Sequence, residues 1–366
     1  MTGTTIAERI EIQAMASELA HRELAPRAAA LDAGGQDVLT ECWRLLAELG
    51  LDRVLLDERH GGAGLGVADL LATIEELAVG DGGIAMCMLL CNAALATLAD
   101  EHLADVPAGA RWALVPAASG TEVTLSNGQL DGGVACALGA YGADGLVILL
   151  DGPEPAAWAV GAGAAGLTLE RDRSQMGLRA APAASVELAG VSCTPARDAS
   201  GGSATAVNVA SALALLRAGT AAIARGISRR AYETALEYAH ARKQGGVTII
   251  EHDAVSDMLS AMAVRLALRP GIAIDEVQAL AAKIATTDAT VASTTDAVQV
   301  FGGTGYMVET GIEKLMRDAK YCQLFPEPNW VAHDELMRPE RTSRMAPLTR
   351  TIAGSGEARA PRGRVL

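Results

Sequence analysis

Apolar side chains recur three and four positions apart along the first hundred residues, which is the spacing of one buried face of an α-helix. Polar or glycine-rich breaks divide this region into four segments, at residues 6–33, 37–49, 67–79 and 84–101. The longest break, from Asp57 to Gly66, is rich in glycine and precedes a new helix start. The pattern therefore predicts an N-terminal helical domain over residues 1–105.

From about residue 106 the pattern changes to short apolar runs that are bounded by Gly, Pro, Asp and Asn. They lie at residues 112–115, 122–125, 146–150, 158–160, 167–169 and 185–188. Such runs are typical of strands and turns, and no long amphipathic segment interrupts them. We predict a small, antiparallel β domain over residues 106–200.

The helical pattern returns near residue 206 in long amphipathic segments, at residues 206–243, 250–268, 272–300 and 309–322. Their lengths and short connections predict an antiparallel helix bundle over residues 201–338. The remaining residues, 339–366, are rich in Arg, Pro, Ser and Gly without periodicity, and we predict a mobile tail. The expected fold class is mainly α with a central β domain.

Composition and charge argue against several classes of protein. The chain has a net charge of −14, which argues against nucleic acid as a partner because phosphate binding needs a basic face. Half of its residues are apolar, which excludes a disordered chain, yet no apolar run reaches the ~20 residues of a membrane span. The first residues carry Glu8 and Glu11 and no signal-peptide pattern. Six scattered cysteines indicate reduced thiols without a zinc site, so we expect a cytoplasmic protein that holds no metal.

Two common catalytic patterns find no support. The string Gly161-Ala-Gly163-Ala-Ala-Gly166 is similar to a dinucleotide-binding loop, but such a loop must open a helix whose amides meet the pyrophosphate. The residues from Leu167 onward read as another strand, so a hairpin is the better interpretation. The histidines are dispersed and no serine occupies a Gly-x-Ser-x-Gly elbow, which gives hydrolase chemistry no basis.

Two strings in the last third of the chain are informative. Tyr238-Ala-His-Ala-Arg242-Lys-Gln244-Gly-Gly closes a long helix, and Gln299-Val-Phe-Gly302-Gly303-Thr-Gly-Tyr follows about 60 residues later. With the Glu-Lys-Leu-Met-Arg-Asp-Ala-Lys string that ends at Lys320, they resemble the acyl-CoA dehydrogenase family. The resemblance extends over nearly the whole chain, to about residue 338, in the order helical domain, β domain, helical bundle.

The resemblance implies FAD-dependent oxidation of an acyl-CoA thioester across Cα–Cβ. The weakly acidic α proton needs a placed carboxylate, and the β hydride needs a cofactor because no side chain accepts one. In the family, residues matching Arg242 and Gln244 bind the FAD pyrophosphate and neighbouring groups. Those matching Gln299, Gly302 and Gly303 approach the adenosine half of an FAD held by a neighbouring subunit. A guanidinium suits phosphate, although Arg242 has the alternative role of a charge that satisfies helix C-terminal carbonyls.

The segments that would contact the flavin ring depart from the family. The usual Thr-Glu-Pro-x-x-Gly-Ser-Asp segment corresponds to Leu114-Val115-Pro116-Ala-Ala-Ser-Gly-Thr121, which lacks the hydrogen-bonding Thr and Glu. The strand that usually presents a Trp beside the flavin corresponds to residues 133–138, which contain none. The β domain is also shorter than is usual in the family.

The catalytic base is displaced as well. The family often carries Tyr-Glu-Gly-Thr after this Lys-containing string, whereas here Pro326 takes the position of the base and Glu327 follows it. One residue matters when the reacting atoms must lie about 3–3.5 Å apart. Other members place the base on the long preceding helix, where Leu216 and Arg217 stand here. Glu327 is the candidate base, with a loop carboxylate between two prolines as the alternative.

Retention of the FAD-binding strings without the flavin-ring segment and the base resembles the non-base subunit of heteromeric dehydrogenases. Such enzymes act on steroid side-chain CoA thioesters, and we expect a heterotetramer with a homologous, base-carrying chain. Two alternatives stay open: a self-sufficient homo-oligomeric dehydrogenase using Glu327, and a flavin-free, CoA-binding scaffold. The helix from Ala279 to Ala292 is apolar on more than one side, which favours burial against other subunits.

Overall fold

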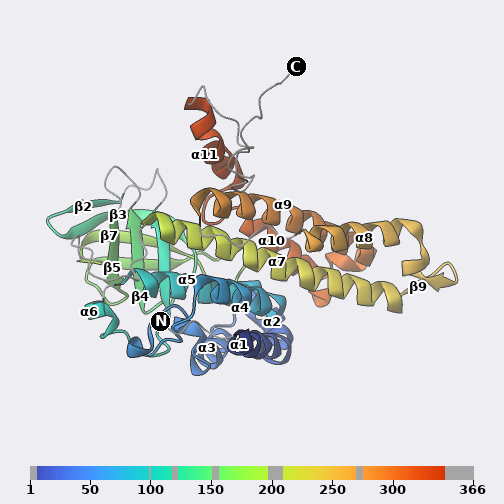
Figure 1. Ribbon diagram of the computed structural model, residues 1–366, viewed down its shortest axis with the longest axis horizontal. Helices are drawn as coiled ribbons and strands as arrows, with labels where there is room; N and C mark the ends of the chain where they lie inside the picture. The colour runs from blue at the N-terminus through green and yellow to red at the C-terminus, as the bar shows by residue number, and fades with distance from the viewer. Residues whose placement is uncertain are drawn as a thin grey trace, which may run out of the picture.

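The computed structural model describes residues 6–98, 100–117, 123–150, 156–196, 209–268 and 275–342. A helical part, a part made of two sheets and a long helical bundle follow one another along the chain, which confirms the predicted fold class. Figure 1 shows the sheets gathered at one end of the elongated bundle, with the N-terminal helices packed along one side of it. The domain boundaries near residues 105, 200 and 338 stay predictions.

The N-terminal helices surround one apolar helix. They are α1 (Ile6–Leu19), α2 (Ala28–Asp32), α3 (Gln36–Glu48), α4 (Val67–Gly80), α5 (Gly82–Thr97) and α6 (Asp100–Leu103). Almost every residue of α5 is buried, as expected of a helix that is apolar all round and lies between other layers. It begins at Asp81, whose carboxylate accepts hydrogen bonds from the amides of Gly83 and Ile84.

Two four-stranded sheets form the central part, in the orders β1-β4-β5-β8 and β2-β3-β7-β6. Their strands are β1 (Trp112–Ala117), β2 (Thr124–Ser126), β3 (Gln129–Ala137), β4 (Gly145–Leu150), β5 (Ala156–Gly161), β6 (Leu167–Arg171), β7 (Ala184–Ser192) and β8 (Thr194–Pro195). β1 pairs with β4 in parallel, which departs from the antiparallel arrangement that we predicted for the whole domain. β2 and β3 intervene in the chain but pair in the other sheet, so β4 enters alongside β1 in the same direction.

The glycine string after β5 leads into a strand, β6, and not into a helix. The hairpin that we predicted there is wrong, because β5 pairs with β4 and β8 while β6 pairs with β7 in the other sheet. The turn therefore carries the chain between the two sheets. Without a helix start, its amides have no aligned dipole to offer a pyrophosphate.

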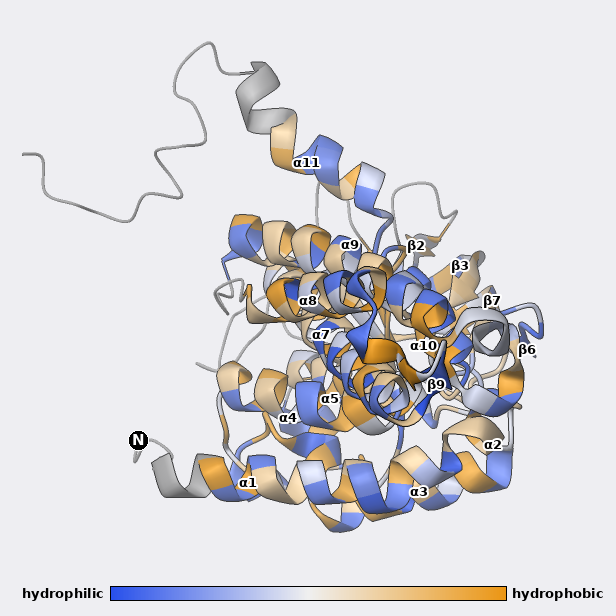
Figure 2. Cartoon of the chain, turned by 90° about the vertical axis from the view of Figure 1, so that its right-hand side faces the viewer, coloured by the Kyte–Doolittle hydropathy of each residue, from blue (hydrophilic) through white to orange (hydrophobic). Residues whose placement is uncertain are grey.

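The C-terminal part is an antiparallel bundle. Its elements are α7 (Val209–Ala241), β9 (Lys243–Gln244), β10 (Val247–Thr248), α8 (Asp253–Ala267), α9 (Glu276–Phe301), α10 (Ile312–Cys322) and α11 (Asn329–Thr342). Among the described helices only α7 is long and apolar enough to cross a membrane, yet 72% of its most apolar window is buried inside the protein, as in a core helix. Figures 1 and 2 show α11 leaving the body of the bundle. It runs to Thr342, and the rest of the predicted mobile tail lies outside the described residues.

Ion pairs on α10 connect the three parts. The Lys314 ammonium, fully buried, lies 2.9 Å from Asp81 and 2.6 Å from Asp318. Asp318 also accepts a 2.6 Å hydrogen bond from the amide of Leu178, in the sheet-containing part. Breaking a buried pair of this kind leaves an uncompensated charge, so the cluster holds α10 in a fixed place against the other two parts.

Candidate functional site

One candidate region lies where α7 ends. Arg242 follows the last turn of α7, and a short hairpin of β9 and β10 brings Gln244 to its tip, at the right-hand end of the bundle in Figure 1. Gly245 and Gly246 turn the hairpin with φ values of +67° and +93°, which side-chain-bearing residues rarely adopt. The side chains of Arg242 and Gln244 are exposed, and within the described chain they form no hydrogen bond or ion pair.

The second glycine string lies at the same end of the bundle. The Phe301 ring stacks on the ring of Tyr238 with centroids 4.0 Å apart, which holds the end of α9 beside the last turns of α7. Gln299, Gly302 and Gly303 are exposed there. No atom lies within 4 Å of the place that a Cβ on Gly303 would take, so its backbone is open to approach. The structure thus brings the five predicted cofactor-binding residues to one end of the bundle.

An apolar strip continues this surface. Tyr306, Met307 and Val308 follow the glycines directly, and their side chains are 79%, 54% and 72% exposed. Three consecutive exposed apolar residues beside open glycines are typical of a surface that another molecule covers. We call Arg242, Gln244, Gln299, Gly302 and Gly303 the open end of the bundle.

Glu327 lies far from the open end. It follows α10 in the loop of residues 323–329, and its carboxylate accepts a 3.2 Å hydrogen bond from Nε of Arg217 on α7. Because α7 rises about 1.5 Å per residue, Arg217 and Arg242 are about 37 Å apart along the helix. Glu327 and the open end therefore cannot act on the same bond.

The surroundings of Glu327 are charged and closed. Arg217 is 3% exposed and also donates a 2.7 Å hydrogen bond to Glu335 on α11. Burial raises the pKa of Glu327 above its ordinary value, while Arg217 and Lys283 act in the opposite direction. A raised pKa suits a catalytic base, but a carboxylate bound to a guanidinium has to release it before accepting a proton. The candidate base Glu327 is thus bound to Arg217 in this structure.

The segments opposite the expected flavin ring are apolar where the structure describes them. Leu114 and Val115 on β1 are fully buried, and Leu138, just after β3, is 4% exposed. These side chains offer no hydrogen bond to a ligand. Cys136 on β3 is exposed, and its sulfur lies 3.5 Å from the hydroxyl of Tyr321. Residues 118–122, which include the end of the departing segment, lie outside the described chain.

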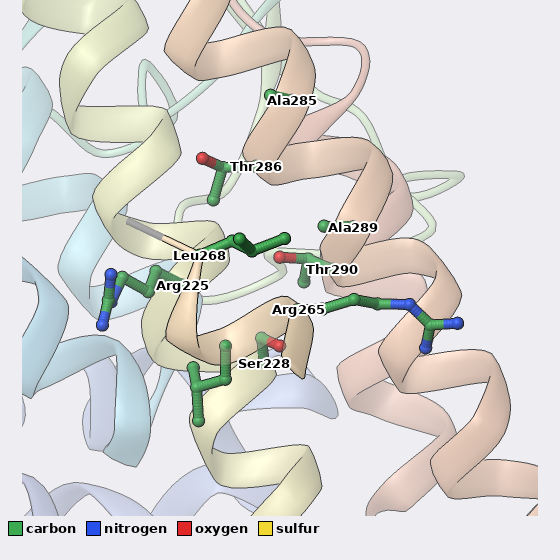
Figure 3. A pocket seen from close by; sticks show the side chains of 9 residues that line it. Arg225, Ser228, Arg265, Leu268, Ala285, Thr286, Ala289 and Thr290 are labelled. Atoms are coloured by element: carbon green, nitrogen blue, oxygen red, sulfur yellow. The ribbon is translucent and has the colours of Figure 1, made fainter. Parts of the chain in front are cut away.

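A cavity of about 270 Å³ opens between α7, α9 and the end of α8 (Figure 3). The guanidinium groups of Arg225 and Arg265 point away from it on opposite sides, where they pair with Glu75 and Asp296. The rest of the lining consists of small, aliphatic and hydroxyl side chains. This cavity therefore holds neither an acid–base pair nor a free charge, and the open end stays the stronger candidate.

Sequence reasoning missed two groups near Glu327. Lys283 on α9 is completely buried, and Glu335 lies on α11. A lysine within the Ala- and Thr-rich stretch from Ala279 to Ala292 was the available signal, because a buried ammonium has to meet acceptors. Nothing in the sequence indicated which acceptors these would be.

Comparisons with known proteins agree with this arrangement. Residues 7–103 match the model of the acyl-CoA dehydrogenase N-terminal domain, and residues 207–326 match that of the C-terminal domain. The chain is 28% identical to the cyclohex-1-ene-1-carbonyl-CoA dehydrogenase of Geobacter metallireducens, over 87% of this chain and 93% of that protein. These two domain models together span more than half of the residues.

Solved structures share the fold. A variant of the Tcur3481-Tcur3483 steroid ACAD has a TM-score of 0.76 and 22% identity, over 92% of this chain and 98% of that one. The FAD-complexed acyl-CoA dehydrogenase of Bacillus anthracis has a TM-score of 0.77 and 18% identity, over 92% and 67%. Homologues in the family bind FAD. By its two matched domains, its fold and the order of its parts, the chain belongs to the acyl-CoA dehydrogenase family.

Proposed function

We propose that this chain is a subunit of an FAD-dependent acyl-CoA dehydrogenase that introduces a Cα=Cβ double bond into an acyl-CoA thioester. In this proposal its open end completes an FAD site at the interface with a homologous, base-carrying subunit. The observation that carries the proposal is that the open end is exposed, and its side chains are unpartnered in the described chain. Polar groups and bare backbone left in this state are available to a ligand from another subunit.

The residues of the open end fit the phosphate and adenosine parts of FAD. The guanidinium of Arg242 offers paired N–H donors to phosphate oxygens, and the Gln244 and Gln299 amides offer further hydrogen bonds. Gly302 and Gly303 let backbone amides come close to the cofactor without a side chain in the way. When bound, FAD supplies the acceptor for the hydride that leaves Cβ.

A partner is invoked because this chain's own carboxylate is engaged. Glu327 shares Arg217 with Glu335, so proton abstraction by Glu327 would require an ion pair to open first. A carboxylate supplied by a homologous subunit avoids this cost. The name of the steroid ACAD with the same fold supports a steroid-related substrate and a complex of two unlike chains. A heterotetramer and a cytoplasmic location are part of the proposal and rest on the family resemblance of the sequence.

A second candidate is a self-sufficient homo-oligomeric dehydrogenase in which Glu327 is the base. The raised pKa of Glu327 favours it, because a general base works best when its pKa approaches the working pH. In this case the hydrogen bond between Arg217 and Glu327 exists only without substrate, and substrate binding breaks it. Substitution of Glu327 by Gln would abolish activity in this case and leave it intact in the heteromer.

The flavin content of the purified protein tests the proposal. Visible absorption is measured for the chain expressed alone and then with its homologous partner. The proposal predicts colourless protein alone and about one FAD per pair of chains after co-expression. Yellow protein alone, with about one FAD per chain, would support the second candidate. Colourless protein in both cases would indicate a flavin-free, CoA-binding scaffold.

A further inference from the structure

The loop of residues 323–329 has an unusual need for external donors. Pro326 and Pro328 lack an N–H group, so this loop has fewer backbone donors than carbonyls. Its backbone hydrogen bonds are few: the amide of Asn329 donates to the carbonyl of Gln323 over 2.9 Å, and the amides of residues 323–325 donate to carbonyls at the end of α10. The Pro328 carbonyl accepts from the amides of Val331 and Ala332 on α11. The remaining oxygens have to be satisfied from elsewhere.

Lys283 supplies these donors from α9. Its side chain is 0% exposed, and its ammonium donates to the carbonyls of Gln323 and Glu327 over 3.3 and 2.5 Å. The third hydrogen bond, of 2.7 Å, goes to Oδ1 of Asn329. An ammonium has three donors and no acceptor, so the three oxygens saturate it. All three belong to the loop, which makes Lys283 specific for this segment.

The same face of α9 holds the other side of the Asn329 amide. Its nitrogen donates to Oγ1 of Thr287 over 3.0 Å and to Oδ1 of Asp288 over 2.7 Å. Thr287 lies one helical turn after Lys283, so both contacts come from one side of the helix. Asn329 is thereby bound at both ends of its side chain, and α11 begins from a fixed residue.

We propose that Lys283 is a positioning residue whose ammonium fixes the loop of residues 323–329, and with it Glu327 and the start of α11, against the bundle. The fixation follows from the contacts alone, whereas its effect on catalysis depends on whether Glu327 is the base, as in the second candidate function. Loss of the ammonium removes its hydrogen bonds to three oxygens of the loop and frees the loop, while the α7–α9 packing remains.

Burial lowers the pKa of Lys283 to about 8, because the charged form loses its hydration. The charged or titratable groups that face it are Glu327, Cys322, Arg217 and Asp288, from α7, α9 and the segment after α10. A neutral amine keeps only two hydrogens, so one of the three bonds is lost on deprotonation. Because the pKa is lowered by burial, raising the pH past 8 nevertheless favours the folded state, in which the lysine is buried and neutral, over the unfolded chain.

Hydrogen exchange followed by mass spectrometry at one fixed pH tests the proposal on the full chain. The variant is Lys283→Met, which keeps the length of the side chain and removes all donors. Lys320→Met is the matched control, because exposed Lys320 contacts only the Gln323 side chain of the same loop, over 2.7 Å. We expect peptides spanning residues 323–331 to exchange at least tenfold faster in Lys283→Met, with peptides from the middle of α9 unchanged.

Unchanged exchange in the loop would overturn the proposal, and so would equal acceleration in the loop and in α9, which marks a purely global effect. Should Lys283→Met fail to fold, Asn329→Ala removes one of the three acceptors and keeps the ammonium on its two carbonyl partners, and a smaller local acceleration is expected in residues 323–331. In the heteromer, where the partner supplies the base, kcat, KM and flavin content should change little in Lys283→Met. In the self-sufficient enzyme of the second candidate, kcat should fall while KM and flavin content change little. An enzyme without activity would contradict the proposed function, whereas the exchange result would still decide the role of Lys283.

Discussion

The two ends of the α7–α9 pair treat their polar groups in opposite ways. Near Glu327, Arg217 and Lys283 are buried and bound to carboxylates, carbonyls and an amide of the same chain. At the open end, the side chains of Arg242 and Gln299 are exposed and form no hydrogen bond or ion pair in the described chain. A buried polar group without a hydrogen bond destabilises the folded chain, whereas an exposed group is hydrogen-bonded by water until a ligand replaces the water. The difference supports our proposal that the open end binds another molecule, whereas the end near Glu327, which we call the closed end, stabilises this chain's own structure.

The contrast between the two ends is tested most strongly by a substitution of Gly303 at the open end. Substitution Gly303→Leu adds a side chain where no atom lies within 4 Å, so the free chain should keep its melting temperature. In the assembled enzyme the same side chain occupies the cofactor's approach, and FAD affinity should fall at least about 100-fold, or about 2.7 kcal/mol. Flavin titration of the co-expressed complex measures this.

Gly163→Leu is the matched control, because Gly163 also has no atom within 4 Å of its Cβ position and lies in the turn between the two sheets. It should leave both stability and FAD affinity unchanged. Normal FAD binding by Gly303→Leu would mean that the open end does not contact the cofactor.

Removal of the buried Arg217 side chain tests whether the charges near Glu327 stabilise this chain's own structure. Arg217→Leu leaves Glu327 and Glu335 without their shared partner, and we expect a loss of about 3 kcal/mol in the free energy of unfolding. Urea denaturation measures it. Arg229→Leu should cost less, because its pair with Glu76, which links α7 to α4, is partly exposed to solvent. A smaller loss for Arg217→Leu than for Arg229→Leu would contradict the closed character of this end.

Arg242→Gln should act on binding and not on stability. Its loss removes charge-assisted hydrogen bonds to phosphate, which are worth about 1.5–3 kcal/mol, so FAD should bind on the order of 10–100-fold more weakly. Because Arg242 is exposed, the unfolding free energy should change by less than about 0.5 kcal/mol. Arg173→Gln, at another exposed arginine, is the control for general loss of charge. Equal FAD affinity in the two variants would refute a phosphate contact.

The smallest expected effect is the pH dependence of the free energy of unfolding that Lys283 causes. Its pKa of about 8 lies below the ordinary 10.5, so the unfolded chain binds the proton more tightly and this group adds stability as the pH rises from 8 toward 10.5. Between pH 7 and 9 the wild type should gain on the order of 1 kcal/mol relative to Lys283→Met. Denaturant unfolding at both pH values compares them. A constant difference would show that Lys283 does not titrate in this window.

The sequence was sufficient for what local patterns control. Periodicity predicted the helical, β and helical order, because amphipathic spacing sets which face of each element is buried. It was insufficient for pairings between distant segments. The parallel pairing of β1 with β4 depends on where the chain returns, and no property of Leu114 or Val147 alone specifies it. The predicted hairpin after Gly161 was wrong for the same reason, because the pairing of β5 and β6 depends on distant strands.

In the candidate site, too, the sequence showed the contiguous motifs but not the contacts between distant residues. The strings around Arg242 and Gln299 could be recognised because they are contiguous, whereas their meeting depends on the stacking of Tyr238 on Phe301 across two helices. The contact of Arg217 with Glu327 joins residues 110 positions apart in the chain. A partner for a buried charge is set by tertiary packing, so the closed end became visible only in three dimensions.

Native mass spectrometry tests the central claim most directly, because it counts chains and cofactors in one particle. The chain is analysed alone and after co-purification with its homologous partner, with free FAD removed. We predict FAD only in assemblies that contain both kinds of chain, at one per unlike pair, and none on this chain alone. Assemblies of this chain alone that carry one FAD per chain would contradict the claim.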